Sequence, residues 1–352
     1  MGQSTKRVFL DTLAQSGTAS SDHFTEHSER VVYGSGSDLA DKDTLKARAR
    51  RKLLTQRMVI SLVDVAQKKD EPERIQAYWN AYHCQNQLSS SDGRVYGKYC
   101  KNRFCTVCCA IRKAEIINRY LPEISTWEDP HFVTLTVKAV PAAKLDYWLK
   151  GIHRAFRQIR EAAKKQNQRG QGIKLIGVKS LECNFNPVAK TYNPHLHLIV
   201  PTAEIAHALK KAWLKKWTPK LTSPKAQYIR KVENLERDLI ETIKYGSKIF
   251  TEPDMQKKAK KKIPPMVYAA ALDTIFCALK KYRLFERFGF NLRKSSARCK
   301  RPAIFLQDCE EWRFRPSHND WLNEETGELM SGYIPSFQLL YLLGQNIDTE
   351  LN

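Results

Sequence analysis

From residue 131 onward, short segments with alternating apolar and polar residues are separated by longer segments with apolar residues every three or four positions. The stretch HFVTLTVKAV (131–140) alternates and is rich in β-branched residues, which predicts a strand. The segment after Pro141 has helical spacing and predicts a helix with the apolar face Leu145, Trp148, Leu149, Ile152, Phe156 and Ile159. The same criteria predict strands at 173–185, 195–201 and 227–232, and helices in IAHALKKAWLKKW and NLERDLIETIKYGSKIF.

The predicted element order is β-α-β-β-α-β-α, which an antiparallel central sheet with helices on one face accommodates. We therefore expect an α+β fold. Asn186, Pro187 and Asn193 join the second and third strands, as in a hairpin with a longer loop. The stretch 267–290 predicts a further helix that ends near Gly289.

The segments that flank this core differ from it in composition. Residues 1–43 are rich in Ser, Thr, Gly and Asp and lack periodicity, which predicts a flexible N-terminal arm. Stretches 44–67 and 71–87 have helical spacing and lead into a cysteine-rich region. We therefore divide the chain into a flexible arm (1–43), a helical and cysteine-rich segment (44–125), the core (126–255), a basic loop and helix that complete the domain (256–300), and a C-terminal segment (301–352).

The composition indicates a soluble, strongly basic protein. Of 352 residues, 59 are Lys or Arg and 37 are Asp or Glu, which gives a net charge of +22. This excess favours a polyanionic partner, and nucleic acid fits better than a membrane because no basic amphipathic helix has a clean aromatic face. We expect no membrane association, since no apolar stretch approaches the length of a span. Nine cysteines without a secretory signal indicate a reducing compartment, hence a cytoplasmic protein.

The stretch NPHLHLIV (193–200) places two histidines one residue apart on a predicted strand. Alternating side chains point to opposite faces, so His195 and His197 share one face. Glu182 lies on the strand that we pair with this one. A Glu-His-His set suits Mg²⁺ or Mn²⁺ shared with a phosphate oxygen, although Asn184 or water could replace Glu182. The alternative is a pair of partly exposed histidines without a ligand.

The stretch ETIKYGSK (241–248) combines a carboxylate, a phenol and two lysines at helical spacing. Glu241 and Tyr245 are four residues apart, as are Lys244 and Lys248, so each pair shares a helix face. A tyrosine hydroxyl in this setting is a candidate nucleophile for phosphoryl transfer. The alternative is that Tyr245 covers a core edge and Glu241 is solvated.

Five of the nine cysteines lie between residues 84 and 109. Cys105 and Cys108 have the spacing of a metal knuckle, and Cys84 and Cys100 complete four thiolates, which suffice for a structural Zn²⁺ site. Cys109 or His83 could replace one ligand, and reduced cysteines around a tight turn are the alternative. Neighbouring basic residues could contact a DNA backbone: Arg103, Arg112 and Lys113.

The stretches FVTLTVK, NPHLHLIV and ETIKYGSK, in this order, resemble the three motifs of rolling-circle plasmid replication initiators of the HUH endonuclease superfamily. The subtype is the one with a single catalytic tyrosine and a glutamate four residues before it. The stretch YCKNRFCTVCCAIRKAE (99–115) resembles the cysteine-rich segment that precedes the first motif. The matches span about residues 84–290 and leave the first 80 and last 60 residues without a motif.

This resemblance implies an HUH endonuclease fold and a role for each matched residue. Tyr245 would attack a phosphodiester of single-stranded or hairpin origin DNA and remain joined to the 5′ phosphate. His195, His197 and Glu182 would hold the divalent metal, and Glu241 would activate the water that ends the cycle. Lys244 or Lys248 would hold phosphate oxygens. A host helicase and a DNA polymerase are the further expected partners.

Two other functions are compatible with these residues. A single-tyrosine HUH transposase or mobilisation relaxase shares the histidine pair, but the Glu-x-x-x-Tyr helix disfavours it. A non-enzymatic, zinc-stabilised DNA-binding regulator would leave the five candidate active-site residues without a common task.

Overall fold

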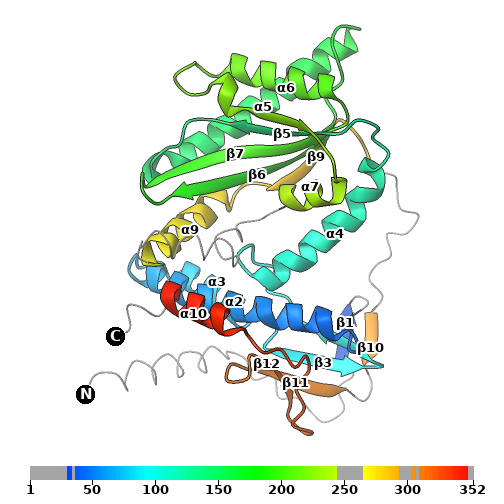
Figure 1. Ribbon diagram of the computed structural model, residues 1–352, viewed down its shortest axis with the longest axis vertical. Coiled ribbons are helices and arrows are strands. Elements are labelled where there is room, and N and C mark those ends of the chain that lie inside the picture. The colour runs from blue at the N-terminus through cyan, green and yellow to red at the C-terminus, as the bar shows by residue number, and fades with distance from the viewer. Residues whose placement is uncertain (1–29, 34–35, 244–264, 293–302, 307–308, 348–352) are drawn as a thin grey trace. The chain divides into compact units, whose positions relative to one another are not determined.

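The computed structural model describes residues 30–33, 36–243, 265–292, 303–306 and 309–347 (Figure 1). The chain divides into two compact units. The first unit combines residues 1–107 with 297–343, and the second combines residues 108–296 with 344–352. The second unit carries the histidine pair.

The second unit is built on a five-stranded antiparallel sheet. Its strand order is β8-β5-β7-β6-β9, which places β7 in the centre. The strands are β5 (His131–Thr136), β6 (Gly177–Asn186), β7 (Thr191–Val200), β8 (Tyr228–Lys231) and β9 (Phe285–Phe288). The predicted hairpin of the second and third strands is confirmed, because β6 and β7 pair from Val178 opposite Ile199 to Asn186 opposite Thr191.

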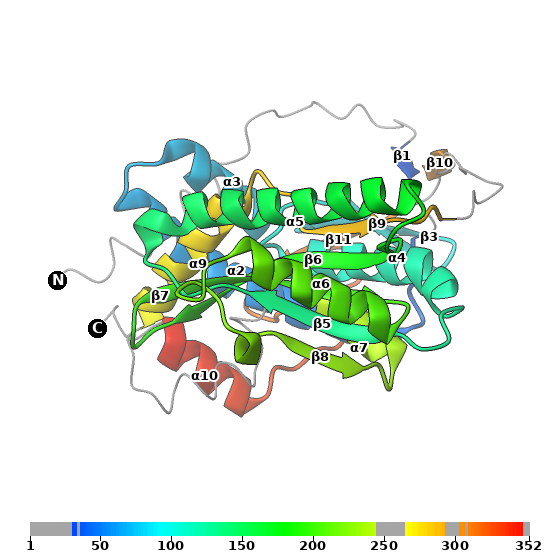
Figure 2. The same ribbon diagram turned by 90° about the horizontal axis from the view of Figure 1, so that it is seen from above.

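Helices cover both faces of this sheet (Figure 2). One face packs against α5 (Leu145–Gln168), α6 (Ala203–Lys216) and α9 (Pro265–Leu279). The other face packs against α4 (Thr106–Ile124) and α7 (Leu235–Thr242). The predicted element order from β5 to α7 is confirmed. The expectation of helices on one face was wrong, because Phe132, Val178 and Ile199 give the second face an apolar part that α4 and α7 bury.

The predicted helix at 267–290 was wrong in its second half. Helix α9 ends at Leu279, and Phe285–Phe288 form β9, which pairs with Gly177–Ser180 of β6. Residues at both ends of β9 are buried, Phe285 against one face of the sheet and Phe288 against the other. Gly289 follows with φ +77, a left-handed conformation that suits glycine. Pairing with the open edge of β6 therefore outweighs the helical spacing of this short apolar run.

The first unit contains a second antiparallel sheet, with strand order β12-β11-β3-β4-β2. Its strands are β2 (Ser37–Asp38), β3 (Gln87–Ser91), β4 (Arg94–Gly97), β11 (Glu310–Arg315) and β12 (Asp320–Asn323). A separate pair joins β1 (Arg30–Tyr33) to β10 (Ala303–Leu306). The unit's helices are α2 (Lys42–Gln67), α3 (Pro72–Tyr82) and most of α10 (Phe337–Ile347). In this unit, residues after 303 pair with strands from the start of the chain, so segments for which no element was predicted complete its sheets.

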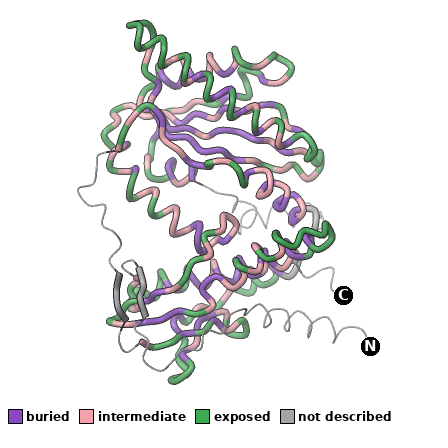
Figure 3. Tube along the Cα trace, turned by 180° about the vertical axis from the view of Figure 1, so that it is seen from behind, coloured by how far each residue is buried: buried purple, intermediate pink, exposed green. Residues whose placement is uncertain are grey.

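Buried residues concentrate on the strands and alternate with exposed residues along the helices (Figure 3). In the first unit, Leu45 and Ala49 of α2 pack with Leu88, Trp312 and Trp321 of the sheet. Among the helices that the structure describes, none is both long enough and apolar enough to cross a lipid bilayer.

Candidate functional site

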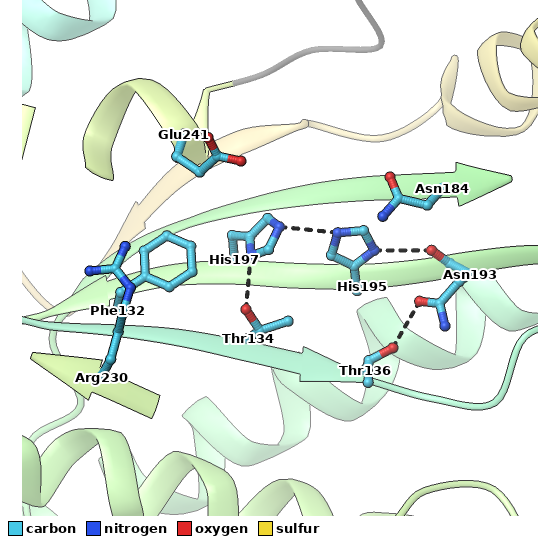
Figure 4. Close-up of a pocket in the computed structure, with 9 residues that line it drawn as sticks. All are labelled: Phe132, Thr134, Thr136, Asn184, Asn193, His195, His197, Arg230 and Glu241. Atoms are coloured by element: carbon cyan, nitrogen blue, oxygen red, sulfur yellow. Dashed lines mark hydrogen bonds between the residues drawn. The ribbon is translucent and has the colours of Figure 1, made fainter. Parts of the chain in front are cut away.

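The histidine pair lies on the central strand β7, with both imidazoles on one face of the sheet (Figure 4). Leu196 and Leu198 alternate with them and are buried in the core on the opposite face. The two Nε2 atoms are 3.1 Å apart. His195 lies directly opposite Glu182 of β6, and His197 lies opposite Thr134 of β5. The predicted pairing of strands thus brings both histidines and Glu182 together.

The geometry and chemistry of this group fit a divalent cation. Glu182 Oε2 lies 3.8 Å from Nε2 of His195 and 3.7 Å from Nε2 of His197. The candidate ligand atoms of all three residues lie within 4.8 Å of one another. Glu182 and His195 are buried, where a carboxylate beside imidazoles needs a compensating charge. A carboxylate with two imidazoles is a donor set that Mg²⁺ or Mn²⁺ accepts.

Hydrogen bonds behind the rings fix which nitrogen atoms face the cation position. Nδ1 of His195 is 3.0 Å from the carbonyl oxygen of Asn193, which can only accept, so this nitrogen donates and Nε2 is the atom that faces the cation position. Nδ1 of His197 is 3.0 Å from Oγ1 of Thr134. Two Nε2 atoms only 3.1 Å apart need a proton or a cation between them. Such outer hydrogen bonds typically orient metal-binding histidines.

A cleft of about 430 Å³ opens over the histidines. It is lined by Phe132, Thr134, Thr136, Asn184, Asn193, His195, His197, Arg230 and Glu241 (Figure 4). Glu241 comes from the last turn of α7, whereas the asparagines come from β6 and β7. Of the predicted catalytic residues, Glu241 therefore reaches the cleft. Lys244, Tyr245 and Lys248 lie outside the described residues.

Arg230 and Asp238 join α7 to the edge of the sheet, and the sequence interpretation missed both. The Arg230 guanidinium donates two hydrogen bonds to the buried Asp238 carboxylate, one of them 2.7 Å long between Nη1 and Oδ2. It also lies 4.9 Å from the centre of the Phe132 ring, and that ring is 5.2 Å from the His197 ring. The hydrogen bond to Asp238 raises the pKa of Arg230 above its ordinary value. The salt bridge thus connects the helix that carries Glu241 to the edge strand β8.

Four predicted cysteines form a second cluster that could hold a metal ion. The sulfur atoms of Cys84, Cys100, Cys105 and Cys108 lie within 4.8 Å of one another. The backbone N–H of Cys100 donates to Sγ of Cys84 at 3.4 Å. Cys109 and His83, the alternative ligands, are not in this group, and His83 Nδ1 instead lies 3.0 Å from Nδ2 of Asn86. Four clustered sulfur atoms are the donor set of a structural Zn²⁺ site.

A buried lysine lies beside the cysteine cluster, and no motif indicated it. Lys52 of α2 is fully buried, and its ammonium group donates to the carbonyl oxygens of Tyr82 and Cys84 at 2.5 and 2.8 Å. A third bond, of 2.5 Å, reaches Oδ1 of Asn86. Burial lowers the pKa of Lys52 to about 8, and the nearby cysteines oppose this shift. The positive charge of Lys52 would also partly neutralise the negative charge of four thiolates.

The predicted DNA-contacting residues lie next to this cluster. Arg103 lies in the loop before α4, and Arg112 and Lys113 lie on α4 itself. All three side chains are partly exposed.

Comparisons with known proteins point to one family. The family model described as "Replication protein" matches residues 94–301, more than half of the chain. The chain is 30% identical to "Protein rep" of Staphylococcus aureus over 166 residues, which cover 42% of this chain and 69% of that protein. It is 26% identical to "Protein rep" of Streptococcus pneumoniae serotype 2 (strain D39 / NCTC 7466) over 225 residues, or 56% of this chain and 66% of that protein. No solved structure matches significantly. The chain therefore belongs to the replication protein family.

Proposed function

We propose that this protein is a rolling-circle plasmid replication initiator of the HUH endonuclease type. It nicks and rejoins single-stranded origin DNA and acts in the cytoplasm with a host helicase and DNA polymerase. The observation that carries the proposal is the convergence of both histidine Nε2 atoms and Glu182 under a cleft that Glu241 also lines. Membership of the replication protein family supports origin DNA as the substrate of this site.

The proposed reaction starts at Tyr245. Its phenol oxygen attacks the scissile phosphorus, a P–O bond to the tyrosine forms, and the bond to the 3′ oxygen breaks. The phenol proton passes to the released 3′ oxygen, and the resulting 3′ hydroxyl primes DNA synthesis. A divalent cation held by His195, His197 and Glu182 would supply Lewis-acid stabilisation of the charge on the phosphate. Lys244 or Lys248 would bind non-bridging oxygens.

Glu241 ends the cycle in this mechanism. Its carboxylate removes a proton from water, the water oxygen attacks the phosphorus at the regenerated origin, and the bond to the 3′ oxygen there breaks. That 3′ oxygen attacks the phosphotyrosine phosphorus and rejoins the strand, and the tyrosine leaves with a proton. The cleft position of Glu241 supports this role. The cysteine cluster would bind Zn²⁺ and stabilise the segment before α4, and Arg103, Arg112 and Lys113 would contact the DNA backbone.

The nucleophile is tested by incubating the protein with a labelled hairpin oligonucleotide that carries the origin nick site, in the presence of Mn²⁺ or Mg²⁺. The wild-type protein should form a covalent adduct that survives denaturing electrophoresis, and Tyr245→Phe should form none, because it lacks the attacking oxygen. Tyr147→Phe, a change at an exposed tyrosine of α5, is the control and should form the adduct normally. Sequence-specific binding without any adduct in the wild type would instead support the DNA-binding regulator.

A second prediction concerns termination. Glu241→Ala should still nick but should accumulate covalent complex or multimeric product, because no general base activates the final water. Glu236→Ala provides a matched control, since Glu236 is exposed on the same helix and lies outside the cleft lining. Normal product lengths from Glu241→Ala would contradict the terminating role. A transposase or relaxase would likewise give unchanged product lengths in Glu241→Ala, because its reaction does not end with a glutamate-activated water.

A further inference from the structure

Tyr228, the first residue of β8, lies on the cleft face of the sheet, and no motif includes it. It pairs directly with Thr134 of β5, and Thr134 pairs with His197 of β7. Directly paired residues share a face. The neighbours of Tyr228 agree with this placement, because Arg230 lines the cleft and Ile229 packs into the core on the opposite face.

The separation of Tyr228 from the histidines matches the size of a nucleotide. Two strand spacings of about 4.8 Å put the Cα atoms of Tyr228 and His197 about 10 Å apart. The Tyr228 side chain is nevertheless 55% exposed. A DNA strand with one phosphate over the histidines can therefore lay an adjacent base over this ring.

The backbone beneath Tyr228 is held firmly. Gln227 is buried, and its Oε1 accepts a hydrogen bond of 2.8 Å from the backbone N–H of Thr136. Its Nε2 donates to Thr222 Oγ1 at 2.6 Å and to the Thr136 carbonyl at 3.3 Å. With Ile229 packed on the other side, the backbone that carries the Tyr228 ring is fixed in place. A tyrosine side chain has only two rotatable bonds to order when it binds, so the loss of conformational freedom is small.

We propose that the ring of Tyr228 stacks on a nucleobase of the single strand in the cleft, next to the scissile phosphate. This role rests on the proposed function. Stacking on exposed aromatic rings is how many proteins hold single strands without reading their sequence. The ligand is thus a single-stranded oligonucleotide, and the ring, not the hydroxyl, carries the interaction.

The test measures binding of a fluorescent oligothymidylate of about 16 nucleotides by anisotropy, in EDTA so that no cleavage occurs. Tyr228→Ala should raise Kd about 5- to 150-fold, which corresponds to the 1–3 kcal/mol typical of one stacked base. Tyr228→Phe should retain most of the affinity. Tyr147→Ala should bind like the wild type, because this tyrosine is 76% exposed but lies on α5, across the sheet. On an abasic oligonucleotide, Tyr228→Ala should no longer differ from the wild type.

Wild-type affinity in Tyr228→Ala, or an equal loss in Tyr147→Ala, would overturn the proposal. A deficit that persists on the abasic strand would also overturn it, since no base is then available to stack. Because binding is measured without a divalent cation, absence of nicking would count against the proposed function alone. Tyr228→Phe is also tested for adduct formation in the presence of Mn²⁺. If this variant bound normally but formed no adduct, Tyr228 rather than Tyr245 would be the nucleophile, and stacking by the ring would still be supported.

Discussion

Replacing His197 with alanine is expected to slow cleavage of single-stranded origin DNA by at least about a hundredfold, because Lewis-acid stabilisation is worth several kcal/mol. The His197 Nε2 atom lies 3.1 Å from that of His195 and 3.7 Å from Glu182, so its removal leaves an incomplete ligand set. Cleavage rates measured over a Mn²⁺ titration and direct calorimetry of Mn²⁺ binding should both show the loss. Thr134→Val should weaken Mn²⁺ binding by about 10- to 100-fold, because Thr134 orients the ring.

His207→Ala is the matched control for this experiment. His207 is exposed on α6, and that helix covers the opposite face of the sheet. This variant should bind Mn²⁺ and cleave like the wild type. If His197→Ala bound Mn²⁺ with unchanged affinity, the histidine pair would not be the cation site, whatever happened to cleavage.

Replacing Cys105 with serine is expected to lower the free energy of unfolding by more than about 4 kcal/mol, as loss of a structural metal typically does. Cys105 is fully buried within the cluster, so serine would leave a neutral hydroxyl where the site needs a thiolate. Zinc content by elemental analysis and unfolding by denaturant should change together. Addition of a strong chelator to the wild type should reproduce the loss of stability.

Cys277→Ser is the control that tests whether replacing a cysteine outside the cluster also lowers zinc content and stability. Cys277 lies on α9, outside the cluster, and its change should leave the zinc content at the wild-type value. A Cys105→Ser protein that retained both its zinc and its stability would show that the cluster does not depend on this ligand.

The sequence was sufficient to predict four of the five strands of the sheet that carries the histidine pair, but not β9. The alternation in β5 and β7 and the apolar stripe of α5 are strong local signals, and the structure confirms them. The faces of His195, Leu196 and His197 also followed from the two-residue period of a strand. Four of the clustered cysteines were identified by their spacing alone.

The remaining features depend on contacts between distant residues. The local sequence pattern does not predict that Arg230 pairs with Asp238. The residues around Lys52 likewise give no indication that its ammonium group binds distant carbonyl groups. Strand β9 has a composition that also suits a helix, and only the open edge of β6 decides its conformation. Helix α4 begins within the cysteine-rich segment. The spacing of its apolar residues did not indicate that it covers the second face of the sheet.

The antiparallel pairing of β11 with β3 has a consequence for biosynthesis. Leu88 of β3 emerges from the ribosome long before Trp312, its partner in β11. The whole stretch 108–296 is translated between them, so the sheet that carries the histidine pair can assemble while β3 still lacks its partner β11. A nascent chain released by a premature stop codon before residue 310 would carry the histidine pair but would leave one side of β3 open to pairing with other chains.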